Sequence, residues 1–267
     1  MPHVEAVYWS FMLGGLVDVP LCLSYNDLQA FPSTETECVI ACAGNPPGGS
    51  LIGQGHWQGI SMQHMLDEVT ISPDAQYAHL FAADGYSTFI DLDQLRQSIL
   101  VYGMNGDALP PEHGYPARLI VPGHYGYKMP KWIQRIMLAD TPSDGLWEQR
   151  GWSQTGQIQT TAQITFPVDQ SSLDGPVLLR GTAYAGDRAI MQVEISIDGG
   201  PWMPAPFTQP ETGVLAQWAI EWTPHSQGEH HIAVRALDES GFVQAATTAS
   251  SPLTNGSSGL HTIVVHV

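Results

Sequence analysis

The first 155 residues mix two hydrophobic periods. Short apolar runs predict strands at residues 8–23, 38–41 and 118–121. Apolar side chains at helical spacing predict a helix that begins at Gly59 and Ser61 and buries Met62, Met65, Leu66 and Val69. Residues 78–100 predict a strand, a loop and then a helix capped near Asp91, with one apolar face made of Leu92, Leu95 and Ile99. Strands and helices therefore alternate in this part of the chain.

A third helix start is marked by its capping residues. Ser24 has the side chain of an N-cap, and Asp27 follows at the third helical position, where a carboxylate can accept the N-cap amide. The two residues predict a short helix over 24–31, directly after the first pair of strands.

Beyond about residue 155 the pattern changes to short strands punctuated by Pro, Gly and Asp. Apolar residues from Met191 to Ile197 alternate with polar ones, and the DGG at 198–200 predicts a hairpin turn. Further strands are predicted at 176–185, 217–222, 230–237 and 261–267. Strands at this spacing are typical of an immunoglobulin-like sandwich. We therefore expect two domains, residues 1–155 and residues 156–267.

The net charge argues against nucleic acid as a partner. The 267 residues carry a net charge of −17, and a protein this acidic is not expected to bind nucleic acid. Residues 1–95 contain no lysine or arginine, whereas six fall between Arg96 and Arg150. We interpret Arg96, Arg135 and Arg150 as surface charges. Two interpretations stand for Arg118, Lys128 and Lys131: surface charge, or donors to an anionic ligand inside an acidic protein.

The candidate chemistry lies at Cys42. Cys42 follows the strand 38–41 and opens a loop of glycine and proline, which leaves room for a large ligand near the thiol. The alternative is that Cys42 is a small buried hydrophobic residue, a common fate of free cysteine. A disulfide with Cys38 is not expected, because four strand residues span about 13 Å and a disulfide allows Cα atoms about 7 Å apart at most.

The residues around Cys42 resemble the molybdenum-cofactor domain of the sulfite oxidase family. That family has Cys-x-Gly-Asn at a strand end, and Cys42, Gly44 and Asn45 match it. WQGISMQHML from Trp57 and MNGDALPPEHGYPARLIVPGHYGYKMPKW from Met104 resemble two further family motifs, and the likeness runs from about Tyr8 to Val267. The loop also resembles a bacterial, membrane-associated subgroup with Gly-Gly-x-Leu-Ile-Gly after the cysteine motif.

The resemblance implies an oxidoreductase that uses molybdopterin, the molybdenum cofactor, with oxygen-atom or electron transfer at the metal. It makes the Cys42 thiolate the metal ligand and Tyr86 a second catalytic residue beside the metal. It assigns cofactor binding to five further residues, with Lys128 the weaker candidate because relatives vary there: Asn45, His113, Arg118, Lys128 and Lys131. His56 is a sixth candidate because it follows the glycine-rich loop, although relatives often have an arginine there; the alternative is an ordinary surface or core histidine.

The resemblance also sets the expected fold class and partners. The fold is α+β, a mixed molybdopterin-binding domain followed by an all-β immunoglobulin-like sandwich that serves dimerisation, so a homodimer is suggested. The remaining partners are a small-molecule substrate, an electron-transfer partner and a membrane-anchored partner or upstream membrane segment. Sulfite is not the expected substrate, because Pro46, Pro47 and the NGSSG run from Asn255 stand where sulfite oxidases place arginines.

The resemblance also implies a location for the protein. The subgroup is extracytoplasmic or membrane-associated, whereas the chain has no signal peptide and no apolar run of about 20 residues, so we expect the chain itself to be soluble. Relatives carry one more pterin-binding element upstream of the position where this sequence begins, and that N-terminal element is expected to be missing here.

Two alternatives to a molybdenum enzyme are open. A cofactor-free binding or structural module could retain this fold. A simple metal site could use Cys38, Cys42 and a histidine, but the strand spacing puts the two thiols too far apart to share an ion.

Overall fold

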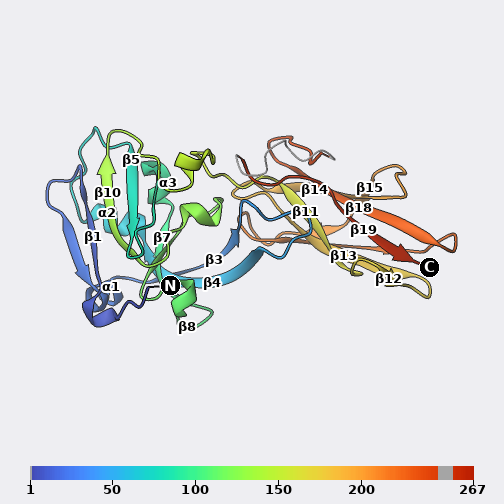
Figure 1. The fold of residues 1–267 in the computed structure, drawn as a ribbon, viewed down its shortest axis with the longest axis horizontal. Coiled ribbons are helices and arrows are strands. Elements are labelled where there is room, and N and C mark those ends of the chain that lie inside the picture. The colour runs from blue at the N-terminus through green and yellow to red at the C-terminus, as the bar shows by residue number, and fades with distance from the viewer. Residues whose placement is uncertain (1, 246–254) are drawn as a thin grey trace. The chain divides into compact units, whose positions relative to one another are not determined.

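The computed structural model describes residues 2–245 and 255–267, and it divides into two compact units (Figure 1). The first unit contains Met1–Ile40 and Gly55–Gly156, and the second contains Ala41–Gln54 and Gln157–Val267. The loop that carries Cys42 therefore belongs to the second unit. The strand before the loop begins in the first unit, and the strand after the loop ends there.

The first unit contains a five-stranded sheet in the order β2-β1-β10-β5-β6. β1 pairs with β10 in parallel, and the other neighbours are antiparallel. The bounds are β1 Ser10–Gly15, β2 Leu21–Ser24, β5 Tyr77–Ala82, β6 Ser87–Asp91 and β10 Ile133–Ala139. β6 and β10 were not predicted from the sequence.

A second sheet has the order β3-β4-β7-β8, with β9 paired to β7. The bounds are β3 Thr34–Ala41, β4 Ile52–Ser61, β7 Ile99–Met104, β8 Asp107–Ala108 and β9 Arg118–Ile120. β3 and β9 confirm the strands predicted before Cys42 and at Arg118. Ile99 begins β7, so its assignment to a helical face was wrong: the preceding helix ends at Arg96, and Ile99 pairs with Ile120 of β9.

Among the described residues, the first unit has three short α-helices: α1 is Tyr25–Ala30, α2 is Met62–Asp67 and α3 is Leu92–Arg96. α1 and α3 begin where their capping residues predict, whereas the expected start of α2 was wrong, because Gly59 and Ser61 belong to β4 and the helix begins at Met62. The Ser24 hydroxyl accepts the Asp27 amide at 3.2 Å, and the Asp27 carboxylate accepts the Ser24 amide at 2.9 Å. Four 3-10 turns complete the unit: η1 Ala6–Tyr8, η2 Pro111–His113, η3 Gly126–Lys128 and η4 Glu148–Arg150.

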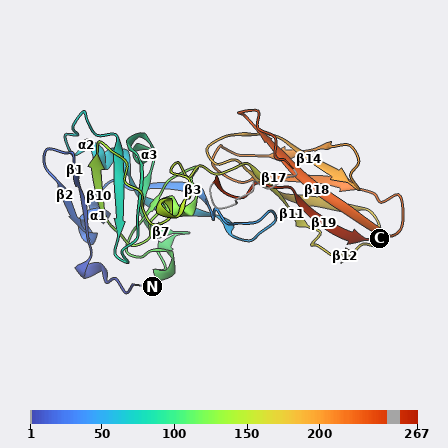
Figure 2. The ribbon, with the colours of Figure 1, turned by 45° about the horizontal axis from the view of Figure 1, so that its top comes forward.

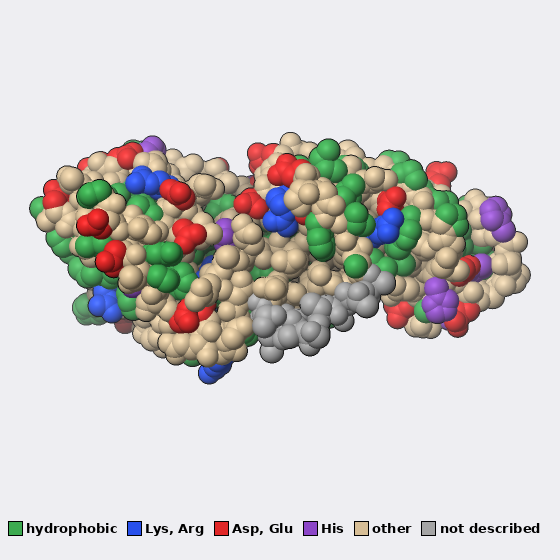
Figure 3. All heavy atoms as spheres, turned by 90° about the horizontal axis from the view of Figure 1, so that it is seen from above, with side chains coloured by type: hydrophobic (Ala, Val, Ile, Leu, Met, Phe, Trp, Pro, Cys, Tyr) green, Lys and Arg blue, Asp and Glu red, His purple; other side chains and the backbone are tan. Residues whose placement is uncertain are grey.

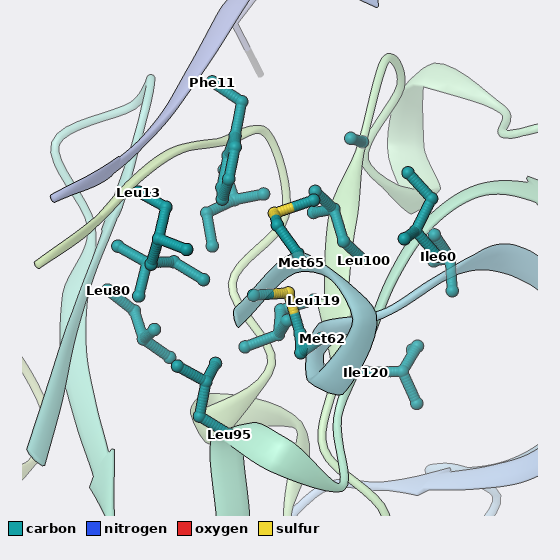
Figure 4. Packing of buried hydrophobic residues seen from close by; sticks show 14 of the residues in the cluster. Phe11, Leu13, Ile60, Met62, Met65, Leu80, Leu95, Leu100, Leu119 and Ile120 are labelled. Atoms are coloured by element: carbon teal, nitrogen blue, oxygen red, sulfur yellow. The ribbon is translucent and has the colours of Figure 1, made fainter. Parts of the chain in front are cut away.

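The core of the first unit lies between the helices and both sheets. Figure 4 shows Met62 and Met65 of α2 pointing among Leu80, Leu95 and Leu119, and both methionines are fully buried. This confirms the core face predicted for Met62, Met65 and Leu66, whereas Val69 lies beyond the end of α2 and is only partly buried. Hydrophobic burial at α2 thus holds the two sheets together.

The second unit is a sandwich of two antiparallel sheets with one short parallel edge strand (Figure 2). One sheet has the order β11-β13-β17-β16, and the other has the order β12-β19-β18-β14-β15. The bounds are β11 Thr161–Phe166, β12 Ser171–Ser172, β13 Val177–Tyr184, β14 Ile190–Ile197, β15 Met203–Ala205, β16 Phe207–Thr208, β17 Ala216–Trp222, β18 Glu229–Asp238 and β19 His261–His266.

The alternation predicted for β14 holds in the middle of the strand and is wrong at both ends. At its far end Ser196, predicted to face solvent, is buried, and Ile197, predicted to be core, is only partly buried. Val193 and Ile195 are buried as expected, but Met191 is 59% exposed. The pairing with β18 shifts register between Ile190 and Gln192, so Ile190 takes the buried position instead. A bulge of this kind moves every earlier side chain to the other face.

Strands outweigh helices in the described residues of both units, and each α-helix of the first unit has only five or six residues. The expected α+β class is therefore confirmed only in part, because the structure is mostly β. Acidic side chains are scattered over the face seen in Figure 3, with few lysines and arginines among them, in keeping with the net charge of −17. Among the described residues, no helix is long and apolar enough to cross a membrane.

Candidate functional site

Cys42 is exposed, so the interpretation of Cys42 as a buried hydrophobic residue is wrong. Its backbone is nevertheless fixed at the end of β3. The Cys42 amide donates to the Leu51 carbonyl at 2.9 Å, and the Cys42 carbonyl accepts the Asn45 amide at 3.0 Å. Cys38 shows the opposite environment: it is buried, and burial raises the pKa of its thiol to about 12 although Arg118 acts in the other direction. Only one of the two thiols can meet a ligand.

Asn45 closes the loop that follows Cys42. Its Oδ1 accepts the Leu51 amide at 2.8 Å, and its Nδ2 donates to the Gly49 carbonyl at 3.4 Å. A Cβ added to Gly49 would lie 2.4 Å from that same Oδ1, so the loop folds tightly around the Asn45 amide. Asn45 therefore shapes the loop, and cofactor binding by Asn45 stays a prediction.

Arg118 is a buried cation in the first unit. It lies on β9 with 5% of its surface exposed, and its guanidinium donates to the carbonyls of His113 at 3.1 Å and Met129 at 3.3 Å. Burial lowers its pKa to about 10. Its Nε is buried and has no hydrogen-bond partner, which is costly for a charged donor. An unpaired donor of this kind marks a place where a ligand oxygen would be stabilised.

Three of the predicted residues come together around Gly114. A Cβ at Gly114 would lie 3.0 Å from the Lys131 Cβ and 3.1 Å from the Arg118 Cβ, and Gly114 has a φ of 114° that side chains rarely adopt. Glycine thus lets Lys131 and Arg118 approach the turn at His113. Burial, followed by the charge of Arg118, lowers the pKa of Lys131.

A hollow of about 580 Å³ adjoins this cluster. It is lined by Pro2, Asp84, Glu112, Lys131 and Trp132. The Lys131 ammonium lies 4.8 Å from the centre of the Trp132 ring and donates to the Glu112 carbonyl at 2.9 Å. The hollow therefore offers a cation and an aromatic face beside two carboxylates.

Lys128 has a different environment from the one expected of a cofactor ligand. Its ammonium is fully buried, lies 2.6 Å from Glu148 Oε1 and donates to the Phe89 carbonyl at 2.9 Å. Thr88 donates a second hydrogen bond to the same Glu148 oxygen. Lys128 is thus engaged within the protein, and we assign it to the scaffold. Glu148 was not singled out from the sequence, since a partner 20 residues away leaves no local signal.

Tyr86 and His56, the remaining candidates, lie apart from the Arg118 cluster in their contacts. The Tyr86 hydroxyl donates to the Tyr127 carbonyl at 2.5 Å, and burial, reinforced by the charge of Glu148, raises the pKa of Tyr86. His56 is exposed on β4, with its Nε2 3.0 Å from a Glu37 carboxylate oxygen. The catalytic role of Tyr86 and the cofactor role of His56 stay predictions.

The described part of the chain contains no set of side chains that could form a simple metal site. No group of three or more His, Cys, Asp or Glu side chains there could hold an ion. The hypothesis of a site made from Cys38, Cys42 and a histidine is therefore unsupported. Cys42 belongs to the second unit and the Arg118 cluster to the first.

The class of protein follows from comparison with known families. Residues 1–147 match the family described as oxidoreductase molybdopterin binding domain, and the chain belongs to this family. Residues 161–234 match the bacterial Ig domain. The family resemblance noted from the sequence motifs is thereby confirmed, whereas the membrane-associated subgroup stays a prediction.

Three individual proteins illustrate the similarity within this family. The chain is 34% identical to the uncharacterized oxidoreductase YuiH of Bacillus subtilis (strain 168), over 62% of this chain and 83% of that protein. It is 28% identical to the mitochondrial sulfite oxidase of Rattus norvegicus, over 86% of this chain and 52% of that protein. It is also 28% identical to the NADH nitrate reductase of Lotus japonicus, over 86% of this chain and 33% of that protein.

A solved structure shares the fold throughout the chain. The sulfane dehydrogenase SoxCD from Paracoccus pantotrophus superimposes with a TM-score of 0.85 at 25% identity, covering 100% of this chain and 79% of that one. The chain thus spans about half the length of the sulfite oxidase and about a third of the nitrate reductase.

Proposed function

We propose that this protein is a molybdenum-cofactor-dependent oxidoreductase of the sulfite oxidase class in which the Cys42 thiolate ligates molybdenum. The observation that carries the proposal is the exposed thiol of Cys42, fixed by backbone hydrogen bonds at the end of β3 in a chain of this family. A soft thiolate suits molybdenum, and the cofactor supplies oxygen-atom or electron transfer when it is bound.

The first unit would hold the pterin through the residues around Gly114. Arg118 presents a buried donor without a partner, and Lys131 adds a second positive charge beside the same glycine. These groups fit an anionic ligand with phosphate and ring oxygens, because guanidinium and ammonium donors form strong bonds to them. His113 takes part through its place in the same turn, and its carbonyl already orients Arg118.

The substrate is proposed to be something other than sulfite. The loop 41–54 and the run 255–261 contain no lysine or arginine, so a dianion near Cys42 would find no positive side chain on either segment. Binding of a doubly charged anion without such partners is weak. An electron-transfer partner completes the proposed activity, because the electrons gained or lost at the metal need an acceptor or donor.

The test is metal and pterin content in protein made by a host that synthesises the cofactor. We expect about one molybdenum and about one pterin per chain. Cys42→Ser should remove one sulfur neighbour from the molybdenum X-ray absorption spectrum and abolish turnover, with unchanged circular dichroism. Cys22→Ser is the matched control, since Cys22 is also exposed and lies on β2 of the first unit.

A second variant tests the pterin assignment. Arg118→Ala should lower pterin occupancy, and Arg118→Lys should restore part of it, because a cation returns without the planar fork. Full occupancy in Arg118→Ala would remove Arg118 from the site. Wild-type protein with neither metal nor pterin would favour a binding module that retains the fold.

A further inference from the structure

The loop that presents Cys42 is attached to the β-sandwich at defined points. The Ser257 amide donates to the Ala43 carbonyl at 3.0 Å, and the Leu215 amide donates to Gln54 Oε1 at 2.8 Å. These bonds tie the start and the end of the loop 41–54 to loops of the second unit. A third attachment, at the middle of the loop, is a packing contact.

This third attachment joins Gly48 to the His261 ring. A Cβ at Gly48 would lie 2.2 Å from both Cδ2 and Nε2 of His261, so the loop backbone rests directly on the imidazole. Gly48 also has a φ of 73°, a conformation that glycine adopts without strain. No other residue type fits there while the ring stays in place.

The His261 ring is itself held from the opposite side. His261 begins β19 of one sheet, and its Nδ1 accepts the Ile164 amide from β11 of the other sheet at 2.9 Å. Because Nδ1 accepts, the neutral ring carries its proton on Nε2. Burial lowers the pKa of His261, which favours this neutral form. The ring therefore has one orientation, set by both sheets.

Fixing Gly48 fixes Cys42, because the loop is bonded internally. The Gly49 amide donates to the Pro46 carbonyl at 2.8 Å, and Asn45 Oδ1 accepts the Leu51 amide. The Cys42 amide in turn donates to the Leu51 carbonyl. A displacement at Gly48 is thus passed on to the thiol through a short chain of hydrogen bonds.

From this geometry we propose that His261 is the positioning residue for the Cys42 thiolate: its imidazole, oriented by the Ile164 amide, supports Gly48 and holds the cysteine loop in one conformation. The sandwich then supports the metal-ligating loop in addition to any dimerisation role. The consequence for molybdenum rests on the proposed function, whereas the positioning of the loop does not.

The first experiment uses metal-free full-length chain and amide hydrogen exchange. In His261→Ala the loop amides that are bonded within the structure should exchange at least about tenfold faster, while amides of β18 in the same unit keep their wild-type rates. The matched control is His266→Ala, which removes a histidine from the same strand whose ring bonds Gln170. Loop exchange in His266→Ala should equal wild type.

Thiol reactivity gives an independent readout. The alkylation rate of Cys42 is measured relative to Cys22 in the same molecule, because both thiols are exposed and Cys38 is buried. We expect this ratio to rise at least about threefold in His261→Ala, since a mobile thiol samples more reactive geometries. Equal exchange and an equal ratio in His261→Ala and wild type would overturn the proposal.

A conservative variant separates support from folding. In His261→Asn the amide oxygen replaces Nδ1 as acceptor for Ile164, while the ring beneath Gly48 is lost. His261→Asn should fold like wild type, and its loop amides should still exchange faster than in wild type. This variant therefore replaces His261→Ala if that protein fails to fold. Loop amides that exchange as slowly as in wild type would contradict the role of the ring. In cofactor-loaded protein, both variants should alter the molybdenum spectrum. Absence of molybdenum from the wild-type protein would refute the proposed function. It would not affect the conclusion from hydrogen exchange that His261 positions the loop.

Discussion

Replacing Lys128 by Met should destabilise the metal-free protein by about 3–5 kcal/mol, because it leaves the Glu148 carboxylate buried without its counter-charge. Both side chains are fully buried, and their charged atoms are 2.6 Å apart. The variant also removes the donor to the Phe89 carbonyl and a cation 4.4 Å from the centre of the Phe89 ring. The other contacts of the Glu148 carboxylate do not replace this charge. The neutral Thr88 hydroxyl donates to Oε1, and Oε2 is buried without a hydrogen-bond partner.

The assay is denaturant unfolding of the full chain, followed by tryptophan fluorescence. A loss of about 3–5 kcal/mol corresponds to a fall in melting temperature of about 6–20 °C for a unit of this size. Adding Glu148→Gln should recover at least about 2 kcal/mol, because both charges are then gone and the amide oxygen still accepts from Thr88. Lys131→Met is the control, with an expected cost below about 1 kcal/mol, since its ammonium makes one bond to a carbonyl near the surface.

The result also decides between two roles for Lys128. A ligand of the cofactor would lower pterin occupancy when replaced and leave the metal-free protein nearly as stable as wild type. A cost below about 1 kcal/mol for Lys128→Met, or no recovery in the double variant, would refute the reasoning from the buried pair.

Three further predictions concern stability in other parts of the chain. Gly181→Ala should cost at least about 2 kcal/mol, because its Cβ would lie 1.9 Å from a backbone carbonyl of β11, whereas Gly53→Ala has nothing within 4 Å of its Cβ and should unfold like wild type. The hydrogen bond to Asp198 raises the pKa of His230 above its usual 6.5, so its stabilisation is complete below pH 6.5 and is lost as pH rises through the raised pKa; unfolding of wild type and His230→Gln from pH 6 to 9 should show a steeper loss in wild type, and parallel curves would contradict this. Ser24→Ala should cost about 1 kcal/mol by thermal unfolding, since the hydroxyl caps α1, and no change would mean that the cap is not formed in solution.

Elements with local signals were predictable from the sequence. α1 and α3 begin at residues whose side chains cap nearby amides, and such bonds span only three positions. β3 ends where a glycine and proline loop begins, and the sandwich strands follow from alternation and turns. The cysteine motif likewise identified Cys42 and the family without any knowledge of packing.

Elements that depend on distant partners were not predictable. β10 lies centrally in its sheet, between β1 and β5, and its neighbours are more than 50 residues away in sequence. The spacing of Ile99 from its apolar neighbours fits a helical face as well as a strand. Its pairing with Ile120 in the folded protein places it in a strand. The bulge that exposes Met191 arises from the pairing of β14 with β18.

The sequence by itself determined the class of protein and the residue types of the candidate site, because short motifs around Cys42 and Arg118 carry that information. Tertiary structure alone decided which groups are available for chemistry. It exposed Cys42 and buried Cys38, four residues earlier, paired Lys128 with Glu148, and left Arg118 Nε without a partner. The physical reason is that burial and ion pairing are set by residues brought together from distant parts of the chain.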